Sequence, residues 1–294
     1  MFTLPSITDE YKKDGVPCVR IENCGNFSVH KTFDCGPAFR FDPDGDDDTF
    51  TGTAFGKKIT FSSLGGGVVE LRGSTAEEYG NTWQRYLSLD SDYVEADRVI
   101  IESMPNERDR AEMSAAVDSG RGIRILRQDP FETLISFIIS QNNNIPRIKK
   151  IISALCEKYG ENGAFPTADA LVEAGEEGIF ALKTGFRAGY IYDAAVKVKT
   201  GEVVLDDIAK CGDYEKCTDM LCSIKGVGPK VSSCVLLFGF GKTEAFPIDV
   251  WMKRSLALHF PDGFDPKPLG KYAGIAQQYM FYHERWINSE STKK

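Results

Sequence analysis

A lysine and an aspartate are the side chains of this chain best suited to covalent chemistry. Lys230 directly follows residues 224–229 (IKGVGP), where two glycines around a valine indicate a tight turn before a helix. Asp249 begins the next apolar helix, after residues 246–248 (FPI). Two helices joined by such a turn form a helix-hairpin-helix, whose backbone amides and helix N-terminus attract a phosphate. An amine and a carboxylate beside this hairpin suggest covalent chemistry on a nucleotide sugar.

The two side chains would have complementary roles. A lysine attacks only as the neutral amine, and the positive end of a helix dipole disfavours its protonated form. Neutral Lys230 could attack the sugar C1′, displace the base and form a Schiff base with the opened sugar. Asp249 would stabilise the developing sugar cation and help to move protons. Each residue also has a simpler interpretation: Lys230 as a solvated helix residue, and Asp249 as a helix N-cap.

Two further segments extend the pattern beyond the hairpin. Residues 126–130 (LRQDP) lead into an apolar helix that ends at residues 140–147 (SQNNNIPR), and residues 185–188 read GFRA. Together with the hairpin, these segments resemble the eukaryotic-type 8-oxoguanine DNA glycosylases of the helix-hairpin-helix superfamily. The resemblance covers residues 25–287 and is strongest in the second half of the chain. Taken alone, the three asparagines indicate only the end of a helix.

The resemblance implies contacts with the DNA strand opposite the lesion. An enzyme that cuts a base must extrude it from the stack and stabilise the remaining gap. Asn142, a small side chain with both donors and an acceptor, would fill that gap. Arg147 and Arg187 would donate to the acceptor edge of the orphaned cytosine. Phe186 would wedge beside it, since an aromatic ring can enter a base step.

The resemblance also implies a pocket for the extruded base. Gly36, in residues 35–40 (CGPAFR), would accept through its carbonyl the N7 hydrogen that only the oxidised base carries. Cys234 would line one side of the base and Phe281 would stack on the other face. Gln277 would bond the Watson–Crick edge. Without the resemblance, Cys234 and Phe281 are ordinary core residues and Gly36 is a turn residue.

The chain departs from the family pattern at three positions. Trp251 stands two residues after Asp249, where the family commonly has a histidine. Phe186 replaces a commoner tyrosine and keeps the ring. Pro229 lies before Lys230, where its fixed φ and missing N–H suit the first turn of a helix.

Length and composition are those expected of an ordinary soluble enzyme. A chain of 294 residues can bury a full core and suggests about two domains. The first ten residues lack a signal-peptide pattern and no apolar run approaches the ~20 residues of a membrane span, which favours a cytoplasmic or nucleoid-associated protein. The eight cysteines show no paired metal spacing and are expected to be reduced thiols. We expect no cofactor, although hairpin carbonyls could hold a structural cation.

The net charge of −8 conceals an uneven distribution. Residues 1–120 carry 12 Lys and Arg against 22 Asp and Glu, whereas residues 121–294 carry 23 against 21. Phosphate binding requires a local basic face rather than a basic protein. Basic side chains near the hairpin that could form this face are Arg147, Lys149, Lys150, Lys225, Lys242, Lys253 and Arg254. The low global charge predicts weak non-specific affinity for DNA.

The pattern of apolar residues changes near residue 105. Before it, period-two alternation and glycine turns predict antiparallel strands at 39–41, 49–55, 59–63 and 68–71, with helices at 75–87 and near 106–117. After residue 129 nearly everything is predicted to be helical. The predicted fold is α+β: a small twisted antiparallel sheet domain over residues 1–105, packed on a helical helix-hairpin-helix domain over residues 106–294.

These observations predict a bifunctional DNA glycosylase and abasic-site lyase. It would excise 8-oxoguanine opposite cytosine through a Lys230 Schiff base and then nick the strand by β-elimination. Its partner would be double-stranded DNA containing oxidised guanine, bound by a monomer. Two alternatives remain: a glycosylase for other damaged bases, which needs Asp249 but not Lys230, and a hairpin module that binds DNA without catalysis.

Overall fold

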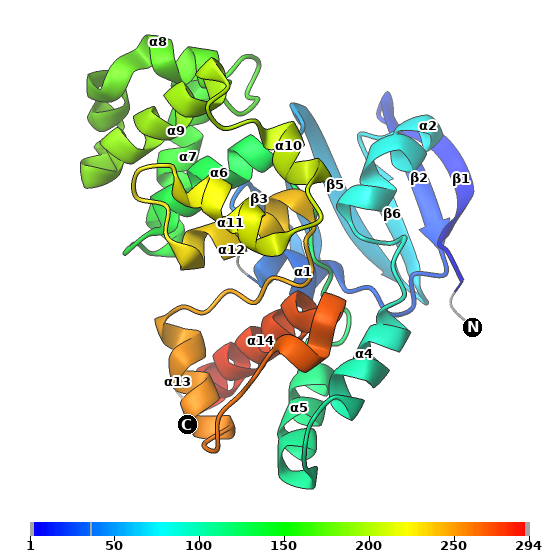
Figure 1. Ribbon diagram of the computed structural model, residues 1–294. Coiled ribbons are helices and arrows are strands. Elements are labelled where there is room, and N and C mark those ends of the chain that lie inside the picture. The colour runs from blue at the N-terminus through cyan, green and yellow to red at the C-terminus, as the bar shows by residue number, and fades with distance from the viewer. Residues whose placement is uncertain (1–2, 36, 292–294) are drawn as a thin grey trace.

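The chain folds into a β-sheet and a larger helical part that lie side by side (Figure 1). The computed structural model describes residues 3–35 and 37–291, with side chains described as far as Arg285. Buried apolar residues form two clusters, one drawn mainly from residues 19–89 and one mainly from the helices. The predicted α+β architecture, with an antiparallel sheet followed by a helix-hairpin-helix domain, is confirmed. The division at residue 105 stays a prediction.

The sheet has six antiparallel strands in the order β1-β2-β6-β5-β4-β3. The strands are β1 Ser6–Lys13, β2 Val16–Glu22, β3 Phe41–Asp44, β4 Asp46–Ala54, β5 Lys57–Gly65 and β6 Val68–Arg72. Alternation is clear in β5, where Ile59 and Phe61 are buried on the core face. Phe41 begins β3, whereas Phe39 and Arg40 precede that strand rather than belonging to it.

Aromatic side chains cover the inner face of the sheet. Phe33 of the short helix α1 (Val29–Asp34) stacks on Phe61, with ring centroids 5.2 Å apart. Trp83 meets the same ring edge-on at 5.8 Å. The helix predicted over residues 75–87 is a series of three short segments: α2 (Ala76–Glu78), a π-helical turn η1 (Tyr79–Trp83) and α3 (Gln84–Tyr86).

The rest of the described chain consists of helices joined by loops. In chain order the α-helices are α4 Tyr93–Glu102, α5 Glu107–Gly120, α6 Pro130–Ser140, α7 Ile145–Tyr159, α8 Ala168–Ile179, α9 Ala188–Thr200, α10 Leu205–Lys210, α11 Tyr214–Cys222, α12 Pro229–Phe240, α13 Val250–His259 and α14 Ala273–Ser291. Short irregular turns η2 (Phe180–Thr184), η3 (Gly185–Arg187) and η4 (Lys267–Tyr272) join some of them. Among the helices of the described ranges, none is long and apolar enough to cross a membrane.

Helices α6 and α12 pack closely because small residues allow it. Gly239 of α12 lies close to α6, since a Cβ there would lie 3.2 Å from the Pro130 Cα, tighter than an ordinary contact. On the same contact, the rings of Phe137 and Phe238 stack with centroids 5.6 Å apart. This contact fixes the two helices whose ends border the cavity described below.

Helix α14 is held against the same core by two glycine contacts. A Cβ at Gly274 would lie 2.9 Å from the Ala245 carbonyl oxygen, and the Gly274 amide donates to the Thr243 carbonyl at 2.7 Å. Farther along α14, Tyr279 packs directly on Gly120 of α5. The first turns of α14 therefore lie at a fixed distance from the segment that follows α12.

Candidate active site

The hairpin predicted at residues 226–228 lies between α11 and α12. Gly226 has a φ of +79°, and a Cβ there would lie within 2.5 Å of Tyr190 ring atoms, so only glycine fits. Val227 is buried in the helical core. Gly228 is the N-cap of α12 and has no side-chain capping bond, which leaves the first-turn amides of that helix to an incoming anion.

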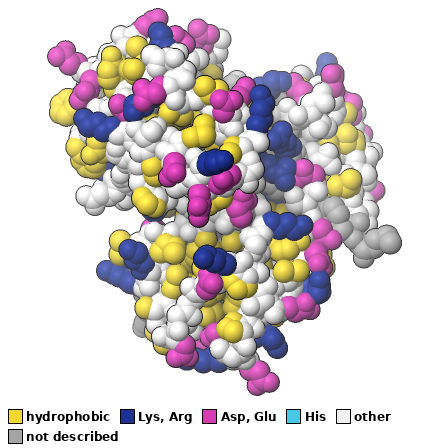
Figure 2. Space-filling model, viewed as in Figure 1, with side chains coloured by type: hydrophobic (Ala, Val, Ile, Leu, Met, Phe, Trp, Pro, Cys, Tyr) yellow, Lys and Arg dark blue, Asp and Glu magenta, His cyan; other side chains and the backbone are white. Residues whose placement is uncertain are grey.

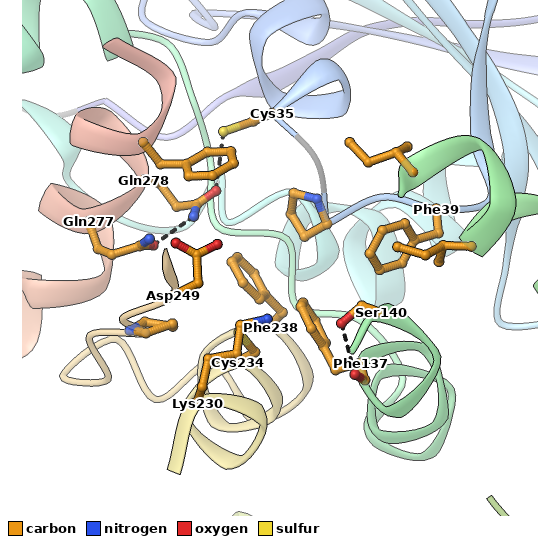
Figure 3. Close-up of a pocket in the computed structure, with 15 residues that line it drawn as sticks. Cys35, Phe39, Phe137, Ser140, Lys230, Cys234, Phe238, Asp249, Gln277 and Gln278 are labelled. Atoms are coloured by element: carbon orange, nitrogen blue, oxygen red, sulfur yellow. Dashed lines mark hydrogen bonds between the residues drawn. The ribbon is translucent and has the colours of Figure 1, made fainter. Parts of the chain in front are cut away.

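Lys230 lies in the first turn of α12, directly after Pro229 at the helix start. Its side chain is half-buried and its Nζ lies 5.3 Å from the centroid of the Phe137 ring. Figure 3 shows Lys230 and Cys234, one turn apart on α12, facing the same space. The hairpin therefore places the candidate nucleophile at the start of α12, where its side chain borders the cavity.

Asp249 caps the next helix, as its position in the sequence suggested. Its Oδ1 accepts a hydrogen bond from the Met252 amide at 2.8 Å, and its backbone is extended before α13 begins. Figure 3 shows the carboxylate directed into the cavity, between the side of α12 and the side of α14. The capping bond fixes the carboxylate without removing it from the site.

Lys230 and Asp249 line one cavity of about 190 Å³. Pockets for drug-sized ligands begin at about 300 Å³, so this space suits one smaller group. Most of its lining is apolar or aromatic and comes from four parts of the chain. The lining residues are Cys35, Pro37, Phe39, Phe137, Ser140, Ile145, Ile148, Lys230, Cys234, Phe238, Pro247, Asp249, Gln277, Gln278 and Phe281.

Cys234 is buried beside Lys230. Burial raises the pKa of the Cys234 thiol to about 11, while the neighbouring Lys230 acts in the opposite direction. The thiol is therefore protonated at neutral pH. Cys234 can line the cavity as a polarisable wall but is a poor nucleophile.

Helix α14 supplies the wall predicted from residues 273–281. Gln277 is 4% exposed and Phe281 is half-buried, and both border the cavity. Gly36, predicted to bind the oxidised base through its carbonyl, lies outside the described residues. Its neighbours Cys35 and Pro37 both line the cavity.

Among the lining residues that had no role assigned from the sequence, Phe137, Phe238 and Gln278 are the most informative. Phe137 and Phe238 form the stacked pair beneath Lys230 and read as ordinary core residues in their helices. Gln278 is 6% exposed and bonds to Cys35 and Gln277. A second amide within an otherwise apolar helical run is the signal that could have identified Gln278, since buried polar groups require partners.

The triple-asparagine segment forms an exposed loop between α6 and α7. Asn142 has a left-handed backbone with φ of +47° and is exposed, whereas Asn144 caps α7 by accepting from the Arg147 amide at 3.0 Å. The Arg147 side chain is exposed and donates to the Lys183 carbonyl at 3.3 Å. This contact brings the loop beside the turn that carries Phe186 and Arg187.

Phe186 and Arg187 differ in exposure. The Phe186 ring is 57% exposed at the surface. Arg187 is 3% exposed and its guanidinium donates to the backbone carbonyls of Gln141, at 2.9 Å from Nε, and Asn142, at 2.9 Å from Nη2. A contact between Arg187 and an unpaired base would require exchange of these bonds. Arg147 reaches solvent without such a change.

Trp251, the residue that departs from the family histidine, is half exposed on the first turn of α13. Figure 2 shows Lys and Arg side chains gathered where the helical part meets the sheet, with acidic side chains scattered over the rest of that face. Of the predicted basic face, Lys149 is paired with Asp42 at 2.7 Å. The described residues include no group of three or more His, Cys, Asp or Glu that could hold a metal ion, and the hairpin cation stays a prediction.

Comparisons with known proteins match the sheet-containing part and the helical part of the chain to two families of DNA repair proteins. Residues 21–134 match the family described as 8-oxoguanine DNA glycosylase, N-terminal domain. Residues 135–268 match the HhH-GPD superfamily of base excision DNA repair proteins. A solved structure of Clostridium acetobutylicum 8-oxoguanine glycosylase/lyase, with double-stranded DNA containing cytosine opposite 8-oxoguanine, is 35% identical, with a TM-score of 0.83 over 98% of this chain and 99% of that one. The chain belongs to the 8-oxoguanine DNA glycosylase family.

The chain is also similar to proteins of Saccharomyces cerevisiae and Methanothermobacter thermautotrophicus. The N-glycosylase/DNA lyase of Saccharomyces cerevisiae is 39% identical over 155 residues, which is 46% of this chain and 41% of the yeast protein. A probable N-glycosylase/DNA lyase of Methanothermobacter thermautotrophicus is 31% identical over 210 residues, 59% of this chain and 67% of the relative. The match thus covers less than half the length of the yeast protein.

Proposed function

We propose that this glycosylase excises 8-oxoguanine paired with cytosine from duplex DNA and then cleaves the abasic strand. The observation that carries the proposal is the placement of Lys230 and Asp249 on one small, largely apolar cavity beside the phosphate-binding hairpin. A lysine of this kind is needed for a covalent lyase but not for simple hydrolysis of the glycosidic bond.

The chemistry follows from the two groups. The neutral Lys230 amine attacks C1′ as the bond between C1′ and the base nitrogen breaks, and the base leaves with the electron pair and takes up a proton. Opening of the sugar ring gives an iminium that links Lys230 to C1′. Loss of a C2′ proton and of the 3′ phosphate then cleaves the strand by β-elimination. Asp249 stabilises the cationic sugar and assists the proton transfers.

The other predicted residues have binding roles in this proposal. Gln277, Cys234, Phe281 and Gly36 hold the extruded base. Asn142, Arg147, Phe186 and Arg187 occupy and read the gap that it leaves, with Arg187 released from its backbone partners. The Clostridium relative, which was crystallised with this lesion opposite cytosine, supports the choice of base pair.

Borohydride trapping tests the proposal. Reduction of the iminium should link the protein covalently to a duplex containing 8-oxoguanine, and Lys230→Gln should abolish the adduct, base release and nicking while leaving DNA binding intact. Lys210→Gln, at an exposed position of α10, is the matched control and should behave as the unmutated protein.

The alternatives are separated when the same assay is repeated on duplexes that carry other damaged bases. A glycosylase for one of those bases would release it without a trapped adduct, and a non-catalytic hairpin module would release no base from any duplex. An adduct that persists in Lys230→Gln would show that another amine is the nucleophile.

A further inference from the structure

A hydrogen-bonded chain joins helix α1 to the base-binding wall of α14. The Cys35 thiol donates to the Gln278 Oε1 at 3.2 Å, and the Gln278 Nε2 donates to the Gln277 Oε1 at 2.7 Å. All three side chains are buried and all three line the cavity. Figure 3 shows Gln278 between its two partners.

The direction of this chain is set at its Cys35 end. Burial raises the pKa of the Cys35 thiol to about 12, so the sulfur carries its proton at neutral pH. The protonated thiol can donate, and in the structure it faces the oxygen rather than the nitrogen of the Gln278 amide. The Gln278 nitrogen is then left to face Gln277, and the Gln277 oxygen must accept.

The Gln277 amide is consequently held in one of its two orientations. A 180° rotation of this amide would place its NH₂ against the NH₂ of Gln278 and lose the 2.7 Å bond. In the observed orientation the Gln277 nitrogen has no hydrogen-bond partner among the described residues. It is available as a donor to a ligand in the cavity.

Purines with a keto or an amino group at C6 require opposite orientations of such an amide. The Watson–Crick edge of a 6-oxopurine presents the O6 acceptor beside the N1–H donor. A 6-aminopurine presents an N6 donor beside the N1 acceptor. A freely rotating amide can match either edge by turning over, whereas an amide that is fixed in one orientation matches one edge and opposes the other.

We propose that Gln278, oriented by Cys35, is a positioning residue that fixes the Gln277 amide and so makes the site select 6-oxopurine over 6-aminopurine lesions. The inference rests on the proposed function and adds to it a determinant of base identity. Gln278 acts through Gln277 rather than by touching the reacting atoms.

Lesion preference tests the inference more directly than activity does. Single-turnover excision would be measured on two duplexes that differ only in the lesion, 8-oxoguanine or 8-oxoadenine opposite cytosine. One mismatched hydrogen bond in a buried site is worth about a tenfold difference, so the unmutated protein should prefer 8-oxoguanine by at least about tenfold. Gln278→Met keeps the length of the side chain but cannot orient the amide. It should slow excision of 8-oxoguanine without slowing excision of 8-oxoadenine, which reduces the ratio about tenfold.

The Cys35 end supplies an independent pair of variants. Cys35→Ser keeps a proton donor and should retain the lesion ratio, whereas Cys35→Ala removes the donor and should lower it. These variants answer the question even if Gln278→Met does not fold. A ratio that is unchanged in both Gln278→Met and Cys35→Ala, or an equal loss on both lesions, overturns the inference. An unmutated protein that releases neither base instead refutes the proposed function.

Discussion

The capping bond and the charge of Asp249 can be separated by two substitutions. In the unmutated protein the Asp249 carboxylate accepts a 2.8 Å hydrogen bond from the Met252 amide. Asp249→Asn keeps an oxygen that can accept this bond but removes the negative charge from the cavity. Asp249→Ala removes both. Loss of the N-cap bond should cost about 1 kcal/mol of folding free energy, whereas the Asn variant should stay within a few tenths of that of the unmutated protein.

The two variants should therefore differ in stability but agree in activity. For a chain of this size, 1 kcal/mol corresponds to a shift of about 2–4 °C in Tm, which calorimetry resolves. Removing a group that stabilises charge in the transition state typically costs about a hundredfold or more in rate. Both variants should lose on the order of a hundredfold in single-turnover excision of 8-oxoguanine, with DNA binding preserved. Normal excision by Asp249→Asn would reduce Asp249 to its capping role and refute this reasoning.

Three further outcomes are expected. Excision opposite cytosine should exceed excision opposite adenine by roughly ten- to a hundredfold, and Arg147→Ala should flatten that difference; equal single-turnover rates in the unmutated protein would limit this arginine to phosphate contact. Gly226→Ala should destabilise the fold by 2 kcal/mol or more, about the cost of overpacking, because its Cβ meets the Tyr190 ring at positive φ. A Cβ at Gly228 would meet nothing within 4 Å, so Gly228→Ala should keep the stability of the fold and mainly weaken DNA binding. Urea denaturation measures the loss of stability in Gly226→Ala, and DNA titration measures the loss of affinity in Gly228→Ala. Burial raises the pKa of the Glu132 carboxyl to about 7, above its usual 4.5. The protonated carboxyl therefore stabilises the folded state fully below about pH 4.5, and this stabilisation is lost as the pH rises through 7. Urea denaturation at several pH values should show that Glu132→Gln removes this pH dependence of the unfolding free energy.

The features predicted well from sequence were those with strong local signals. Gly226, Pro229 and the flanking apolar runs specify a turn between two helices almost independently of the rest of the chain. Strand β1 was not predicted, because its residues SITDEYKK are polar and mostly exposed at the sheet edge and show no apolar alternation. Edge strands are stabilised by pairing with a neighbour, here β2, which a local pattern does not contain.

Side-chain direction was the part of the site that residue type could not predict. Arg187 was predicted to donate to the orphaned cytosine, which stays a prediction; in this structure its guanidinium donates to the carbonyls of Gln141 and Asn142. The role of Gln278 depends on Cys35, 243 residues away in sequence, so no local pattern links them. Both features arise from tertiary contacts that satisfy buried polar groups.

The two thiols of the cavity, Cys35 and Cys234, bear on how readily the protein itself is oxidised. Peroxides oxidise thiolates rather than thiols, and the susceptibility of a cysteine follows its ionised fraction and its accessibility. Cys234, with a pKa of about 11, would be ionised in roughly one molecule in ten thousand at pH 7, and Cys35 in fewer. Both are also buried. The two sulfurs of the cavity are therefore poor targets for the oxidants that would produce the proposed substrate, oxidised guanine.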